Sequence, residues 1–206
     1  MKFSGVITSE ANKRNTFFKD KIQLISFAVI AVSLIIGSAF YLLSEEYFNA
    51  EIKKLFSESL SFMTTGSAFE IFSGIMVLHA VYFIIMTVFG TSSLGYVFIL
   101  LMTFFKTLSI GLINAFLYSN YGLKGIEYCC LVFFPGKYLI LLVMLMLTYF
   151  CIKNSMHVKE CMRGEYNKER KDNTYPIRLF VIGILLSVSI AVECFLVRNF
   201  SQLFSF

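Results

Sequence analysis

Residues 101–111 read LMTFFKTLSIG, an apolar run with one lysine, Lys106, at its centre. Of the 206 residues of the chain, 57% are hydrophobic and 15% are charged, and the mean hydropathy is +0.74. The chain is more hydrophobic and less charged than soluble domains, which indicates an integral membrane protein. A lysine at the centre of a membrane-spanning helix costs about 2.5–3.5 kcal/mol on insertion, so Lys106 is expected to face the protein interior.

The apolar residues form blocks long enough to cross a bilayer, which takes about 20 helical residues. We expect five spans, at about residues 22–43, 71–89, 96–118, 126–152 and 177–197. The turns 90–95 and 119–125 are short, so the second, third and fourth spans are predicted to be antiparallel neighbours. The predicted fold is an all-α polytopic membrane bundle that forms one domain over residues 1–206.

Basic residues are distributed unevenly between the two sides of this arrangement. The N-terminal tail and a loop at 153–176 carry Lys2, Lys13, Arg14, Lys19, Lys21, Lys153, Lys159, Arg163, Lys168, Arg170, Lys171 and Arg178. The other side carries Lys53, Lys54, Lys124 and Arg198. Because basic loops stay on the cytoplasmic side, we expect a cell-membrane protein with a cytoplasmic N-terminus and an outer C-terminus. The net charge of +5 reflects this asymmetry and does not indicate a nucleic-acid partner.

The first span has an alternative interpretation as a cleaved signal peptide, because the small residues GSA at 37–39 follow an apolar core. Its apolar run is longer than the 7 to 15 residues that are typical of signal peptides. We therefore expect an uncleaved anchor.

Motifs of catalysis are absent from the sequence. It has no HExxH, no GxSxG, no phosphate-binding glycine loop and no CxxC pair, and none of its five cysteines suggests a metal site or a disulfide. We therefore expect no catalytic residue, cofactor or metal. His79, in the second span, is expected to be neutral and bonded across the bundle. A serine hydrolase using His79 and the serines of GTSS at 90–93 is disfavoured, because about 20 Å of helix separates them.

A polar cluster is expected in the membrane interior. Pro135 and Gly136, within FFPGKYL at 133–139, are predicted to break the fourth span and to free the backbone carbonyl of Leu131. Lys106 is expected to bond such carbonyls, since Glu127 and Glu193 are predicted to lie at other depths. Lys137 reaches the same region. Two interpretations stay open: the lysines hold the bundle together, or they form a transport site for a small molecule or ion.

Two further groups of residues stand out. Small residues at the ends of the third and fourth spans, which permit close helix approach or a sharp turn, are Gly95, Gly111, Gly122 and Gly125. The outer loop 44–70 has apolar residues at helical spacing, namely Phe48, Ile52, Leu55, Phe56, Leu60 and Met63. It is expected to form an amphipathic helix that lies on membrane lipid, on a partner, or on the rim of the bundle itself.

Residues from about 89 to 155 resemble the stage II sporulation protein M family. The matching positions are Gly90, Gly95, Phe105, Lys106, Gly111, Gly122, Lys124, Gly125 and Pro135. The chain departs from the pattern at Thr107, where the family often has glycine, and at Gly136 and Lys137, where it commonly has Gln-Asn.

This resemblance implies a role in endospore formation. Family members lie in the mother-cell membrane at the septum and hold together peptidoglycan-degrading sporulation proteins, whose work thins the septal wall and drives engulfment. The family member itself is a scaffold and not the hydrolase. A transporter, or transporter subunit, with a mid-membrane site at Lys106 and Lys137 is the alternative function.

Overall fold

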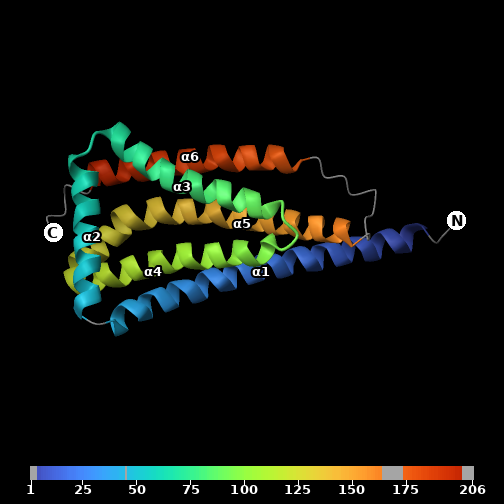
Figure 1. Ribbon diagram of the computed structural model, residues 1–206, viewed down its shortest axis with the longest axis horizontal. Coiled ribbons are helices and arrows are strands. Elements are labelled where there is room, and N and C mark those ends of the chain that lie inside the picture. The colour runs from blue at the N-terminus through green and yellow to red at the C-terminus, as the bar shows by residue number, and fades with distance from the viewer. Residues whose placement is uncertain (1–3, 45, 164–173, 201–206) are drawn as a thin grey trace.

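The computed structural model describes residues 4–44, 46–163 and 174–200, and these residues contain helices and no strand (Figure 1). The helices are α1 (Ser4–Leu43), α2 (Glu46–Thr65), α3 (Ala68–Gly90), α4 (Gly95–Tyr128), α5 (Phe134–Met162) and α6 (Tyr175–Phe200). A π-helical turn, η1 (Cys129–Phe133), joins α4 to α5. The prediction of an all-α polytopic bundle is confirmed.

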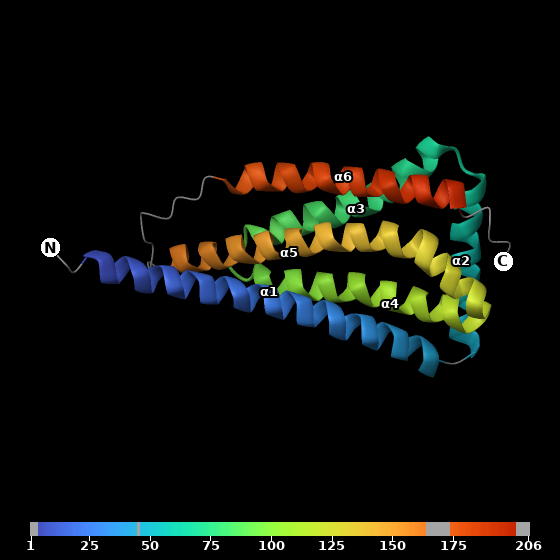
Figure 2. The same cartoon turned by 180° about the vertical axis from the view of Figure 1, so that it is seen from behind.

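Within the described part of the chain, four helical segments are long and apolar enough to cross a membrane. One of them, Gly95–Met162, has 68 residues, which would extend for about 100 Å if it were straight, and a bilayer core is only about 30 Å thick. The segment reverses at Gly122, whose φ of 54° lies in the left-handed region that glycine adopts without strain. As a result, α4 and α5 run antiparallel, side by side (Figures 1 and 2).

Helix α2 lies crosswise over one end of the bundle, which we call the α2 end (Figures 1 and 2). The reversal between α4 and α5 and the last turns of α6 lie at the same end. The start of α1, the turn between α3 and α4, and the start of α6 lie toward the opposite end.

The helices are longer than their predicted spans, α1 and α5 among them. Helix α1 begins at Ser4, whereas the first span was expected to begin at about residue 22. Helix α5 continues to Met162, whereas a loop was expected from residue 153. Residues 153–162 contain neither proline nor glycine, so nothing in them ends a helix that is already formed. The rest of the predicted basic loop, at 164–173, lies outside the described residues.

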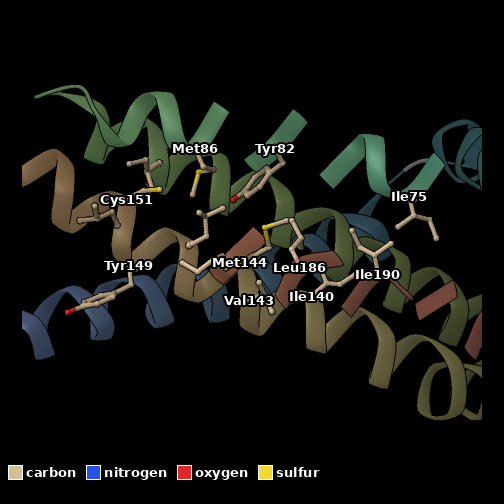
Figure 3. Close-up of a cluster of buried hydrophobic side chains, with 14 of the residues drawn as sticks. Ile75, Tyr82, Met86, Ile140, Val143, Met144, Tyr149, Cys151, Leu186 and Ile190 are labelled. Atoms are coloured by element: carbon tan, nitrogen blue, oxygen red, sulfur yellow. The ribbon is translucent and has the colours of Figure 1, made fainter. Parts of the chain in front are cut away.

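The largest core cluster joins α3, α5 and α6, whose side chains converge in Figure 3. Its members include Ile75, Tyr82, Met86, Ile140, Met144, Leu186 and Ile190. A second cluster lies beneath α2 and includes Tyr41, Phe116, Val132 and Phe133. Because lipid is as apolar as these side chains, the bundle is stabilised by close packing and by hydrogen bonds between helices.

Helices α1 and α4 form the most extensive helix contact of the bundle. A Cβ atom on Gly37 would lie 2.2 Å from the carbonyl oxygen of Leu108, and one on Gly111 would lie 2.3 Å from that of Leu34. The hydroxyl of Ser38 donates to the carbonyl of Gly111 at 3.0 Å. The two backbones therefore approach so closely that only glycine fits at these two positions.

The turn between α3 and α4 is fixed by α5. Ser155 donates to the carbonyl of Ser92 at 2.6 Å and accepts from the backbone N–H of Tyr96 at 2.9 Å. Asn154 donates to the carbonyl of Gly90 at 2.9 Å. The helical extension of α5 beyond residue 152 therefore supplies the side chains that hold this turn.

Candidate functional site

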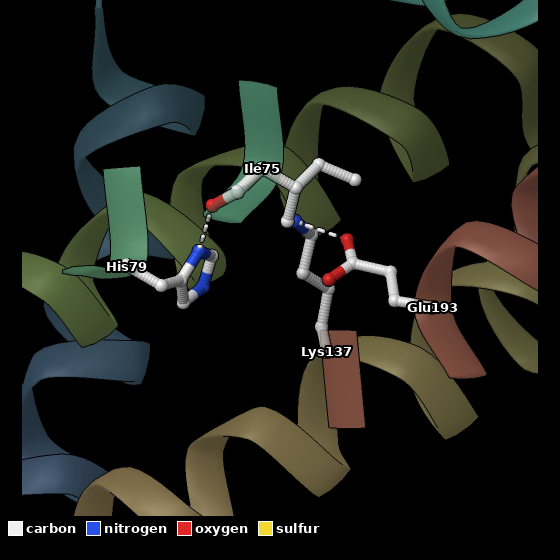
Figure 4. Close-up of polar contacts among 4 residues, drawn as sticks. All are labelled: Ile75, His79, Lys137 and Glu193. Carbon is white, nitrogen blue, oxygen red and sulfur yellow. Dashed lines mark hydrogen bonds and ion pairs between the residues drawn. The ribbon is translucent and has the colours of Figure 1, made fainter. Parts of the chain in front are cut away.

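An ion pair lies inside the bundle, between Lys137 of α5 and Glu193 of α6 (Figure 4). Glu193 is only 1% exposed. The expectation that Glu193 lies at a different depth from the lysines is wrong with respect to Lys137. That expectation measured depth from the predicted ends of each span, but the lateral packing of α6 on α5 sets which residues face each other.

Gly136 allows this pairing. A Cβ atom at Gly136 would lie 3.0 Å from Cγ and 3.3 Å from Cα of Glu193, so the two helices approach closely at this point. Pro135 lies in the first turn of α5, where its missing N–H does little harm.

The predicted break at Pro135 takes the form of the π-helical turn η1. The N–H of Phe134 bonds to the carbonyl of Cys129, five residues earlier, so the helix continues through the irregular region. The expected bond from Lys106 to a carbonyl of this region is not formed among the described contacts.

Lys106 nevertheless belongs to the same cluster. Lys106 of α4 is partly exposed, and it interacts electrostatically with Lys137 and Glu193. The second carboxylate oxygen of Glu193, Oε2, is buried and has no hydrogen-bond partner. The cluster therefore holds two ammonium groups and one carboxylate, and one oxygen of that carboxylate is unsatisfied.

His79 is buried on α3 beside this cluster (Figure 4). Its Nδ1 donates to the carbonyl of Ile75, one turn earlier on its own helix, at 2.9 Å. A bond across the bundle was expected; the bond within α3 replaces it, because the Ile75 carbonyl lies within reach of the ring on the same face of the helix.

A chain of hydroxyl groups in the bundle interior was not singled out from the sequence. Thr103 bonds to Thr148 at 3.0 Å and to Tyr82 at 3.4 Å, and Thr107 bonds to Ser33 of α1. Thr103 and Thr107 lie one turn apart on the buried face of α4. Their spacing within an apolar span was the sequence signal for these contacts between helices.

The remaining glycines lie at turns or crossings. Gly95 ends the α3–α4 turn, where a Cβ atom would lie 1.7 Å from the carbonyl oxygen of Phe89. Gly122 and Gly125 form the reversal between α4 and α5, and a Cβ atom on Gly125 would lie 2.1 Å from the carbonyl oxygen of Leu117. Gly111 lies in the α1–α4 crossing described above.

The apolar residues of α2 divide into two groups. Ile52 and Phe56 pack on the second core cluster, and the rings of Phe56 and Phe116 are 4.9 Å apart. Phe48 and Leu55 are exposed, Leu55 at 64%. Leu60 and Met63 lie on the helix, but their side chains fall outside the described residues. The rim of the bundle therefore accounts for part of this apolar surface and leaves part of it open.

These features define a class: a polytopic helical membrane protein with a charged cluster inside its bundle and a helix laid across one end. The chain belongs to the stage II sporulation protein M family, whose model matches residues 26–198. It is thus a sporulation-related membrane protein. No curated protein and no solved structure matches it.

Proposed function

We propose that this protein is a non-enzymatic scaffold that holds peptidoglycan-degrading proteins at the sporulation septum, where their activity thins the septal wall and permits engulfment. Membership of the stage II sporulation protein M family is the observation that carries the proposal. The ion pair also supports the proposal. Lys137 of α5 pairs with the buried Glu193 of α6, and such a pair is expected where charges hold two helices together.

The distribution of charge supports an orientation in which the α2 end faces the cell wall. Lys153, Lys159, Arg163 and Arg178 lie toward the opposite end, which the positive-inside rule assigns to the cytoplasm. Helix α2 then lies on the outer side of the membrane. Its exposed residues Phe48 and Leu55 offer an apolar surface to a partner that acts on peptidoglycan.

A deletion strain tests the function. Sporulating cells stained with a membrane dye are expected to form polar septa and then to fail in engulfment. Restoration by the wild-type gene is the control. Normal engulfment in the deletion strain would contradict the scaffold role and would favour the transport alternative at Lys106 and Lys137.

A further inference from the structure

The charged cluster contains more positive than negative charge. Lys106 and Lys137 face one carboxylate, Glu193, and Lys137 already forms the ion pair with it. Even if the ammonium of Lys106 also reached the unsatisfied Oε2 of Glu193, the cluster would keep one uncompensated positive charge. His79 adds no negative charge. An uncompensated cation inside a bilayer is unfavourable and calls for an anionic partner.

Lys106 lies where such a partner has access to it. Its neighbours Phe105 and Ser109 are exposed on the outside of α4, whereas Thr103 and Thr107 face the interior. Lys106 also interacts electrostatically with His79 of α3.

Both α3 and α4 carry exposed apolar side chains in this region, and Phe105 of α4 is exposed at 57%. Leu78 of α3 is exposed at 68%. Exposed apolar side chains, Phe105 and Leu78, therefore lie on the two helices near the Lys106 ammonium.

The described residues of a second copy of this chain do not offer a suitable anion. Among the described spanning residues, Glu193 is the carboxylate at this depth, and it is already buried against Lys137. Glu70 and Glu127 lie toward the α2 end of the bundle. Lipid phosphate groups lie about 15 Å from the middle of a bilayer, too far from a residue at the centre of its span.

We propose that Lys106 binds a carboxylate in the membrane-spanning helix of a different protein, which docks on the exposed apolar side chains of α3 and α4 near Lys106. The complementary charge supplies specificity, and the apolar surface supplies close packing. This inference does not depend on what the partner does outside the membrane.

Photo-crosslinking in sporulating cells tests this inference. Benzoylphenylalanine replaces Ser109, one turn from Lys106, and in a control strain it replaces Ile184, which is exposed on α6. We expect position 109, and not position 184, to form an adduct with a membrane protein that has Asp or Glu within its spanning helix. Lys106→Met should remove the adduct, and Lys106→Arg, which keeps the charge, should retain it.

Charge exchange separates binding from folding. Replacing the partner's carboxylate with lysine should abolish the adduct, and combining that change with Lys106→Glu should restore it. The inference is overturned if position 109 captures only lipid or a second copy, if the partner has no spanning carboxylate, or if Lys106→Met leaves the adduct intact. A partner without a peptidoglycan-degrading domain would support this inference without supporting the proposed function, which the deletion strain tests separately.

Discussion

Glu193 is a charged residue in a buried, closely packed environment. It is 1% exposed, one of its carboxylate oxygens pairs with Lys137, and a Cβ atom on Gly136 would lie only 3.0 Å from its Cγ. A charge in such a place is tolerated because its partner is there, and removal of either partner leaves the other unpaired.

Glu193→Gln is expected to destabilise the protein by less than the roughly 3–5 kcal/mol of a fully buried pair, because it leaves the Lys137 ammonium, whose side chain is 24% exposed, without a carboxylate. The double variant Lys137→Leu/Glu193→Leu should lose less, because it leaves no unpaired charge. Unfolding in detergent measures both. Glu127→Gln, at an exposed carboxylate, is the matched control and should unfold like the wild type.

Sequence reasoning identified Lys106, Pro135, Gly136 and Lys137 as an interior group but paired them wrongly. Helical rise gives the depth of a residue only when the ends of its span are known, and α6 continues to Phe200, beyond the predicted end at 197. Packing across the bundle determines which faces of two helices meet. A single sequence does not reveal that packing.

Among helices, the α1–α4 crossing depends on Gly37 and Gly111. Gly111→Ala is expected to destabilise the protein by about 1–3 kcal/mol, because the added methyl group would lie 2.3 Å from the Leu34 carbonyl oxygen and would push α1 away. Gly183→Ala on α6 is the control, since its nearest neighbour there would be 3.9 Å away. Equal melting temperatures for the two variants would contradict this close approach.

Substitutions on two faces of α2 are expected to affect stability and partner binding separately. Phe56→Ala should lower the unfolding temperature, because its ring packs on Phe116. Leu55→Ala should leave unfolding unchanged, because Leu55 is exposed, and should slow engulfment if α2 docks on a partner. Unfolding in detergent and microscopy of sporulating cells measure the two effects. Normal engulfment with Leu55→Ala would show that Leu55 is not part of a docking surface.

The helices themselves were largely predictable from the sequence. Hydropathy located the apolar segments because insertion into lipid depends on composition over about 20 residues. The extension of α5 to Met162 was missed because residues 153–162 are polar enough to resemble a loop. Their role, which is to bond the α3–α4 turn through Asn154 and Ser155, depends on tertiary contacts.

The orientation of the whole molecule is testable with single cysteines in a cysteine-free background. Lys124→Cys, at the reversal between α4 and α5, should react with a membrane-impermeant maleimide in intact cells. Arg163→Cys, just beyond α5, should react only after the membrane is permeabilised. The opposite pattern would place α2 in the cytoplasm and would remove it from contact with peptidoglycan.

The α1–α4 crossing also has a consequence for synthesis at the ribosome. Ser33 and Thr107, which bond across the crossing, are 74 residues apart in the chain. At about 5–20 residues per second, α1 waits about 4–15 s in the membrane before its partner is made. During this interval Gly37 and the hydroxyls near it have no α4 to pack against. The nascent first helix is then a substrate for whatever chaperone or insertase shields polar groups in lipid.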